Sequence, residues 1–326
     1  MRYVRLGNTS LRVSDLALGT GALASRVDEK TSLKIMDCYI GEGGTFIDTA
    51  NVYGRWNPGN LPLSERMIGR WLSFHHLRDK VILATKGAAD NEGEKGKKRL
   101  SKQEIRQDLQ DSLKHLRTDY IDLYYLHQDD PSRDVGEIME TVNELKKEGL
   151  VRYFACSNWS ARRMEEADRY AAEHGLEGFA VDEIMFNLAK ANEKTVLEAT
   201  QSCVNEEIFR YHNRKQRPLT AYTSQAAGFF ALYQEKDFLT NEKYSFPRDY
   251  FYNEATLGRA RRVEMLKKLT GRSELEITLG YLYAQPFQVI PIVGPWKEEE
   301  LKSSIRAAEC RLSKEERDFL LDGEEF

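Results

Sequence analysis

The feature that most constrains the fold is a regular alternation of short apolar segments with amphipathic helical segments along almost the whole chain. Eight segments are typical of strands, and none shows the apolar/polar alternation of a half-exposed sheet. Such strands, separated by helices, are typical of a parallel sheet that is buried on both faces. The expected strands are residues 16–18, 45–47, 81–85, 120–126, 151–156, 179–186, 219–222 and 288–293.

The length of 326 residues allows one large α/β domain. We predict that residues 1–326 form a single closed (β/α)8 TIM barrel, with a doubly wound open sheet as the alternative. Residues 3–15 are expected to form a hairpin ahead of the barrel. After the seventh strand, the aromatic-rich segment 229–253 interrupts the rhythm, and we expect a long loop that acts as a lid, a binding loop or a flexible segment.

Capping signals and apolar periodicity place the helices between these strands. Ser101 and Glu104 form a capping-box pattern, and Asp134 opens the next helix. Later helices are expected at about 193–214, 255–269 and 273–285, and a final one from residue 297.

The composition argues against several classes of protein. A formal net charge of −4 gives no electrostatic reason to expect nucleic acid or an anionic membrane as a partner. No segment approaches the roughly 18 apolar residues of a membrane helix, and the N-terminus has no apolar signal region. The four cysteines are widely spaced without a C-x-x-C pair, which indicates reduced thiols. We therefore expect a soluble cytoplasmic protein whose partner is a small molecule, and the sequence leaves the oligomeric state open.

Polar residues follow three successive strands at the points where those strands end. Asp48, Lys86 and His127 occupy these places, and Tyr53 lies on the loop after Asp48. Active sites of parallel barrels lie at the C-terminal ends of the strands, so the four side chains are expected to converge there. Each has an alternative structural reading: a helix cap for Asp48, a core tyrosine, a snorkelling lysine and a buried histidine with satisfied hydrogen bonds.

The chemistry of these four groups favours proton transfer to a carbonyl oxygen. A tyrosine hydroxyl titrates near pH ~10, and a neighbouring ammonium lowers its pKa by favouring the phenolate. We expect Lys86, held by Asp48, to have this effect on Tyr53, and His127 to donate a hydrogen bond to the same oxygen. The set contains no nucleophile, so a reaction in which a cofactor delivers hydride suits it.

The sequence resembles the aldo-keto reductase family from its N-terminal hairpin to residues 290–294. The resemblance implies an NAD(P)H-dependent oxidoreductase that reduces an aldehyde or ketone to an alcohol, or catalyses the reverse. It also implies that Tyr53 is the general acid, that Lys86 and Asp48 tune it, and that His127 orients the carbonyl. The matching motifs are Asp48-Thr49-Ala50-x-x-Tyr53-Gly54, Ala84-Thr85-Lys86, Asp122-Leu123-Tyr124-Tyr125-Leu126-His127 and Ser157-Asn158.

The same resemblance implies a set of cofactor-binding residues. Ser157 and Asn158 match residues that hold the nicotinamide carboxamide, and Tyr222 matches the aromatic residue that stacks on the ring. A glutamine usually completes the carboxamide site, whereas this chain has Glu183, which can accept from the amide nitrogen but cannot donate, so the site is altered. The remaining expected cofactor residues are Thr20, Gly21 and Asp48 near the nicotinamide riboside, Thr223, Gln225 and Gly228 near the pyrophosphate, and Gly294, Trp296, Glu300 and Ser304 towards the adenosine.

The adenosine end departs from family members that prefer NADPH, which commonly place a basic residue on the 2′-phosphate. Here Glu300 occupies that position. A carboxylate repels a phosphate and suits a ribose diol, which favours NADH. Two alternatives stay open: Lys297, Lys302 or Arg306 could supply the positive charge, and residues 298–300 could simply begin a helix favourably.

The substrate is indicated only by aromatic neighbours of the site. Trp56 and Trp159, with Tyr53 and His127, are placed to wall a pocket for a sugar-derived or aryl carbonyl, although core or lid packing would also explain the tryptophans. A metal-dependent barrel enzyme using His127, Asp129 and Asp130 is an alternative, but no second clustered histidine accompanies them and we predict no metal. A non-catalytic nicotinamide-nucleotide-sensing subunit is the alternative from another class.

Overall fold

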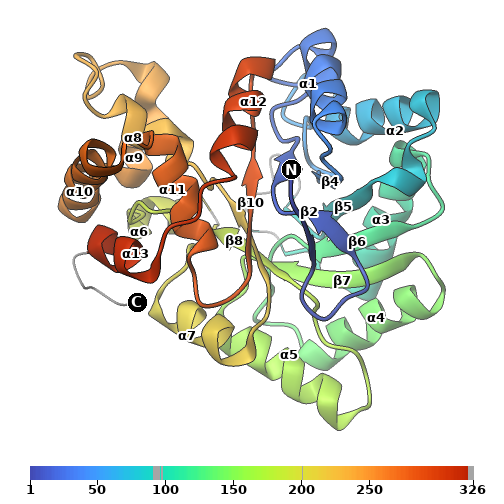
Figure 1. The fold of residues 1–326 in the computed structure, drawn as a ribbon. Coiled ribbons are helices and arrows are strands. Elements are labelled where there is room, and N and C mark those ends of the chain that lie inside the picture. Colours follow the sequence, from blue (N-terminus) through green and yellow to red (C-terminus); the bar gives the residue numbers. More distant parts are fainter. Residues whose placement is uncertain (91–95, 97, 200, 322–326) are drawn as a thin grey trace.

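The strands form a closed parallel barrel, as predicted, and this excludes the open sheet (Figure 1). The computed structural model describes residues 1–90, 96, 98–199 and 201–321. Around the barrel the strands follow the order β10-β3-β4-β5-β6-β7-β8-β9. They are β3 (Ala17–Gly19), β4 (Phe46–Asp48), β5 (Ile82–Gly87), β6 (Ile121–Leu126), β7 (Val151–Ser157), β8 (Asp182–Met185), β9 (Leu219–Tyr222) and β10 (Val289–Val293).

Helices surround these strands (Figure 1). Several begin where the sequence predicts: Ser101 and Glu104 form a complete capping box, and Asp134 accepts a hydrogen bond from the backbone N–H of Gly136. The helices are α1 (Glu29–Gly41), α2 (Leu63–His75), α3 (Lys102–Leu116), α4 (Val135–Lys147), α5 (Ala161–Glu173), α6 (Glu193–Glu198), α7 (Glu206–Lys215), α8 (Phe229–Leu232), α9 (Ser245–Phe251), α10 (Glu254–Thr270), α11 (Glu274–Tyr283), α12 (Glu298–Ala307) and α13 (Lys314–Leu321).

The apolar side chains of the strands face two separate cores. One set packs against the surrounding helices, and the other fills the barrel with the hairpin of β1 (Tyr3–Arg5) and β2 (Arg12–Ser14). Within the barrel the Tyr125 hydroxyl lies 2.9 Å from the Thr220 hydroxyl. The inner set consists of Leu6, Leu11, Val13, Ala17, Phe46, Ala84, Leu123, Tyr125, Ala155, Val181, Ile290 and Ile292.

Three parts of the fold differ from the sequence-based expectations. The helix expected at 193–214 is broken into α6 and α7, and the final helix α13 was not predicted. The segment 229–253 is not a structureless loop, because it contains α8, α9 and a short 3-10 turn. It is held by its aromatic residues: Phe229, Phe238 and Phe251 are at most 1% exposed.

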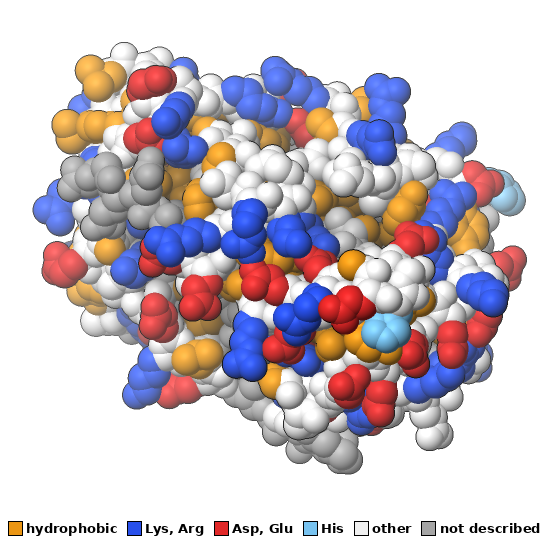
Figure 2. Space-filling view, turned by 90° about the horizontal axis from the view of Figure 1, so that it is seen from below, with side chains coloured by type: hydrophobic (Ala, Val, Ile, Leu, Met, Phe, Trp, Pro, Cys, Tyr) orange, Lys and Arg blue, Asp and Glu red, His pale blue; other side chains and the backbone are white. Residues whose placement is uncertain are grey.

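The surface mixes both signs of charge. On the face shown in Figure 2, Lys and Arg side chains lie among Asp and Glu side chains, in keeping with the small net charge of −4. Across the described ranges, no helix combines the length and the apolar character that crossing a membrane requires. All four cysteines are free in the structure.

Candidate active site

A single layer of polar side chains lies above the apolar interior of the barrel. Successive strand side chains point to opposite faces, so a residue two places after an inward-facing one also points inward. Phe46, Ala84, Tyr125, Ala155 and Val181 belong to the inner core. The residues two places further along these strands are Asp48, Lys86, His127, Ser157 and Glu183.

Strand pairing then brings the predicted groups together at the C-terminal ends of the strands. Asp48 is paired in register with Ala84 of β5, and Lys86 with Tyr125 of β6. Tyr53 returns towards them because the chain turns at Gly54, which has φ +93°. A Cβ atom at Gly54 would lie only 2.7 Å from the Cβ of Leu63, so the turn depends on glycine.

Lys86 lies at the centre of the cluster and is fully buried. Its Nζ atom lies 2.6 Å from both carboxylate oxygens of Asp48 and donates to the backbone oxygen of Thr49 at 3.0 Å. The same Nζ lies 5.2 Å from the centroid of the Tyr53 ring. The predicted convergence of Asp48, Tyr53 and Lys86 is therefore present in the structure.

Glu183 is a further member of this cluster. Its Oε1 atom lies 3.2 Å from Lys86 Nζ, and its side chain is 2% exposed. Its Oε2 atom is buried and has no hydrogen-bond partner among the described residues. From the sequence, Glu183 was expected only beside the nicotinamide carboxamide, and its ion pair with Lys86 was not predicted. Its position two residues after the inward-facing Val181 was the available signal.

Burial and mutual attraction shift the ionisation of the cluster in opposite directions. Burial raises the pKa of Asp48, and the Lys86 ammonium only partly opposes this. Burial raises the pKa of Glu183 well above its ordinary value, and the nearby Asp48 carboxylate adds to the increase. For Lys86, burial alone would lower the pKa, but the two carboxylates outweigh it and the pKa is raised. Lys86 is therefore an ammonium ion.

The expected lowering of the pKa of Tyr53 is not found. Burial raises the pKa of the Tyr53 hydroxyl, and Asp48 and Glu183 raise it further. Lys86 does act in the expected direction, but its effect is smaller than that of burial. The sequence indicates that the Lys86 ammonium is near Tyr53, but it does not show how deeply the Tyr53 hydroxyl is buried. Tyr53 is therefore held as a neutral phenol, which can donate its proton.

His127 lies at the edge of the same cluster. Its ring centroid is 6.0 Å from that of Tyr53, and its Nδ1 atom is buried with no hydrogen-bond partner in the described part of the chain. Burial, together with the positive charge of Lys86, lowers the pKa of His127 to about 3. The imidazole is therefore neutral, with one nitrogen able to donate a hydrogen bond.

Asn158 links the strands around the site through its side-chain amide. Its Nδ2 donates to the backbone oxygen of His127 and the Ser157 hydroxyl, both at 3.1 Å. Its Oδ1 accepts from the Tyr222 hydroxyl at 2.8 Å and from the backbone N–H of Ser202 at 3.0 Å. An asparagine side chain makes about four such bonds, so a direct bond from Asn158 to a carboxamide requires one of these to be exchanged.

The residues expected beside the nicotinamide riboside lie close to Tyr53 and Asp48. The Thr20 hydroxyl is buried and donates to the backbone oxygen of Asp48 at 2.8 Å. Gly21 faces the Tyr53 ring, and a Cβ atom there would lie 3.7 Å from it. Thr20 therefore positions the end of β4 rather than presenting a free hydroxyl.

The segment 223–228 after β9 has an unusual backbone. Thr223, Ala226 and Ala227 have φ angles of +52°, +48° and +49°, and Gly228 has +79°. Residues other than glycine rarely adopt this left-handed conformation, so it persists only where the surroundings fix it. The Gln225 side chain supplies one such contact, donating to the Ser304 hydroxyl of α12 at 2.8 Å.

Glu300 has a structural role at the start of α12. Its Oε2 accepts a hydrogen bond from the backbone N–H of Trp296 at 2.8 Å. A carboxylate in the first turn of a helix is favourable, as the alternative reading of residues 298–300 predicted. Trp296 is 50% exposed, and Gly294 follows β10 with open space around its Cα. The interaction of Glu300 with Trp296 gives no support to a preference for NADH.

The two tryptophans expected to wall the substrate pocket lie in different environments. Trp56 is 39% exposed, and its ring centroid is 6.3 Å from that of Tyr53. Trp159 is completely buried, with its ring 5.0 Å from that of Phe179 in the outer core. Trp159 therefore packs in the helix layer, which is the core packing that the sequence left open, and the left-handed Asn158 (φ +61°) ends the inward-facing pattern before it.

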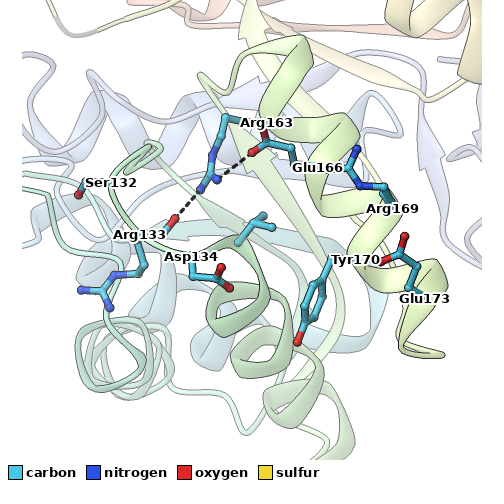
Figure 3. Close-up of a pocket in the computed structure, with 9 residues that line it drawn as sticks. Ser132, Arg133, Asp134, Arg163, Glu166, Arg169, Tyr170 and Glu173 are labelled. Carbon is cyan, nitrogen blue, oxygen red and sulfur yellow. Dashed lines mark hydrogen bonds and ion pairs between the residues drawn. The ribbon is translucent and has the colours of Figure 1, made fainter.

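The residues of the metal-site alternative are engaged elsewhere. Asp129 forms an ion pair with Arg163 at 3.1 Å, and Asp130 accepts a hydrogen bond from the Ser132 hydroxyl at 2.5 Å. A cavity of about 560 Å³ lies nearby between α4 and α5 (Figure 3). In this view the Arg163 side chain points towards the backbone oxygen of Arg133 and the Glu166 carboxylate. None of the four predicted catalytic residues lines it.

Comparisons with known proteins identify the family of the chain. A model of the aldo/keto reductase family matches residues 15–320. An uncharacterised oxidoreductase of Bacillus subtilis, YrpG, is 32% identical over 97% of this chain and 93% of its own. An aryl-alcohol dehydrogenase [NADP(+)] of Phanerodontia chrysosporium is 27% identical over 96% of this chain and 83% of its own. The crystal structure of a thermostable aldo-keto reductase, Tm1743, with the inhibitor epalrestat has the same fold, with a TM-score of 0.72 at 23% identity and 99% coverage of both chains.

Proposed function

Since this chain belongs to the aldo/keto reductase family, we propose that it interconverts an aldehyde or ketone and the corresponding alcohol with a nicotinamide cofactor. Membership of the family makes it an oxidoreductase. The observation that most strongly supports the proposed reaction of a carbonyl is the buried Lys86. Its Nζ atom contacts Asp48 at 2.6 Å and lies beneath the Tyr53 ring. This arrangement supplies a proton donor without a nucleophile.

Each residue of the cluster has a defined part in the proposed reaction. Tyr53 donates its hydroxyl proton to the carbonyl oxygen as that oxygen becomes an alkoxide, a stronger base than a phenolate. Lys86 stabilises the phenolate that Tyr53 becomes, and Asp48 holds the ammonium in place. Neutral His127 donates a hydrogen bond that orients the carbonyl. In the reverse direction the Tyr53 phenolate accepts the alcohol proton.

The surrounding residues fit a nicotinamide dinucleotide. The buried Glu183 Oε2 atom, which has no partner in the described chain, would accept a hydrogen bond from a carboxamide N–H. The partly exposed ring of Tyr222 offers a stacking surface beside it. The left-handed segment around Ala226–Gly228 resembles the backbone concavities that bind anions, and suits the pyrophosphate. A bound reduced nicotinamide would supply the hydride.

An aryl aldehyde is the first substrate to test, with sugar-derived aldehydes second. Trp56 and Tyr53 provide adjoining aromatic surfaces, which suit an aryl group or the apolar face of a sugar. One relative is named for aryl alcohols and NADP(+), so NADPH is the first coenzyme and NADH the comparison. Glu300, which caps α12, is not an argument for NADH.

The test is turnover by the purified protein with NADPH or NADH and benzaldehyde or a small sugar aldehyde. Tyr53→Phe should reduce the turnover number by about 100-fold or more while changing the dissociation constant of the cofactor little. Tyr3→Phe is the matched control, because the Tyr3 hydroxyl donates to the Gly43 backbone at the hairpin. Wild-type turnover by Tyr53→Phe would contradict the proposed proton donor. Cofactor binding without turnover in either protein would favour the nucleotide-sensing alternative.

A further inference from the structure

Glu183 gives the cluster one more negative charge than its single ammonium can neutralise. Asp48 and Glu183 are both 2% exposed, and both lie against Lys86 Nζ. With both carboxylates ionised, the three buried groups would carry a net charge of −1. An uncompensated buried charge is costly, so the cluster favours holding one extra proton.

The geometry identifies Glu183 as the carrier of that proton. Asp48 contacts Lys86 Nζ through both oxygens at 2.6 Å, whereas Glu183 does so through one oxygen at 3.2 Å. Asp48, with the stronger ion pair, keeps its charge, and Glu183 holds the proton.

The remaining titratable neighbours do not compensate for the ionisation of Glu183. The other such groups that act on it are the hydroxyls of Tyr53, Tyr125 of β6 and Tyr222 of β9. Burial raises the pKa of each of these tyrosines, so all three stay neutral. Only a positive charge brought into the site can stabilise the Glu183 carboxylate further.

The two redox forms of a nicotinamide differ by one such charge. The oxidised ring carries one positive charge, and the reduced ring is neutral. We propose that Glu183 keeps its proton beside a reduced nicotinamide and releases it beside an oxidised one. The Glu183 O–H bond breaks, the proton passes to solvent, and no electrons are transferred. This inference rests on the proposed nicotinamide binding and gives Glu183 a role that a neutral glutamine could not have.

The measurable consequence is a pH dependence that only one redox form shows. If binding releases a proton, affinity rises with pH, by up to about tenfold per pH unit while Glu183 is protonated in the free protein. Affinity for NADP+ should therefore rise relative to that for NADPH. NADP+ and NADPH carry the same phosphates, so comparing their affinities removes the contribution of phosphate titration to the pH dependence.

The experiment measures dissociation constants of NADP+ and NADPH between about pH 6 and 9 from the quenching of tryptophan fluorescence. Glu183→Gln should abolish the difference in pH dependence, because the amide cannot ionise. Glu65→Gln is the matched control: Glu65 is also fully buried, but it binds the Thr85 hydroxyl and His115 outside the cluster. It should behave as the wild type.

Calorimetry of the wild type provides a readout that does not depend on a variant. Titrations with NADP+ in two buffers of different protonation enthalpy should reveal the release of up to one proton, and titrations with NADPH should not. Equal pH dependence for both redox forms, or a difference that persists in Glu183→Gln, would overturn the role of Glu183 and leave the proposed function intact. If neither nucleotide binds, the proposed function fails and the role of Glu183 fails with it.

Discussion

Replacing Lys86 with methionine isolates the central interaction of the site. Methionine has a similar length and suits a buried position, so the main change is the loss of the ammonium. The Asp48 carboxylate, which is 2% exposed, is then left without a counter-ion beside the protonated Glu183. Removing one partner of a buried ion pair typically costs about 3–5 kcal/mol. We expect a loss of this size in the free energy of unfolding near pH ~8, because the buried Asp48 carboxylate loses its partner.

The loss should shrink at lower pH, and the sign follows from the direction of the pKa shifts. The pKa of Asp48 and that of Glu183 are already raised by burial, and removing Lys86 takes away the opposing attraction. A carboxyl group with a raised pKa in the folded state binds its proton more tightly there than in the unfolded chain. Stability is therefore lost as the pH rises from the ordinary carboxyl range through the raised value.

Urea unfolding followed by tryptophan fluorescence at about pH 5.5 and 8 measures both effects. Lys86→Met combined with Asp48→Asn should recover part of the loss, because the unpaired carboxylate is gone. Lys302→Met is the matched control, since the Lys302–Glu298 pair is exposed and worth roughly 0–1 kcal/mol. The reasoning is refuted if Lys86→Met costs no more than this control, or costs the same at both pH values.

Three further results are expected. Ala227→Gly should raise the free energy of unfolding by about 1 kcal/mol, because Ala227 has φ +49° and glycine adopts this conformation without strain. Ala172→Gly, at an exposed position of α5, is the control and should lower the free energy of unfolding. A lower free energy of unfolding for Ala227→Gly would show that the backbone at Ala227 is not strained. Glu300→Ala should lower the free energy of unfolding by about 0.5–1 kcal/mol, because the hydrogen bond to the backbone N–H of Trp296 is lost. The preference between NADH and NADPH should stay unchanged, and a change of preference would show that Glu300 contacts the ribose. Because burial lowers the pKa of His127 to about 3, its NMR ring signals should not titrate between about pH 5 and 8, and a transition there would refute its neutrality.

Much of the barrel could be predicted because each strand carries its own local signal. Mostly apolar runs such as 121–126 are bounded by turns and capping residues, and eight of them specify the closed sheet. The helix α13 was missed because it lies beyond the last strand, where the strand–helix rhythm no longer helps. The aromatic segment 229–253 was taken for a loop because its order comes from packing between its own rings, such as Phe229 and Phe238.

Some contacts of the site could likewise be predicted from local sequence signals, whereas others depend on how distant strands are arranged. Asp48 and Lys86 could be paired because they end neighbouring strands, β4 and β5. Glu183 lies on β8, which is not adjacent to β5, so its contact with Lys86 crosses the barrel and depends on the closed geometry. Trp159 lies in the outer core because the left-handed backbone at Asn158 reverses the inward-facing pattern, which the sequence does not show.

The most direct test of the account is whether this protein transfers hydride from a nicotinamide to a carbonyl carbon. The purified protein is incubated with benzaldehyde and NADPH that carries deuterium at both C4 positions, and the alcohol product is analysed by mass spectrometry. The account predicts benzyl alcohol with one deuterium on the carbinol carbon, formed by the wild type and at least about 100-fold more slowly by Tyr53→Phe. Product without deuterium, or no product while NADPH is bound, would contradict hydride transfer at the site around Lys86.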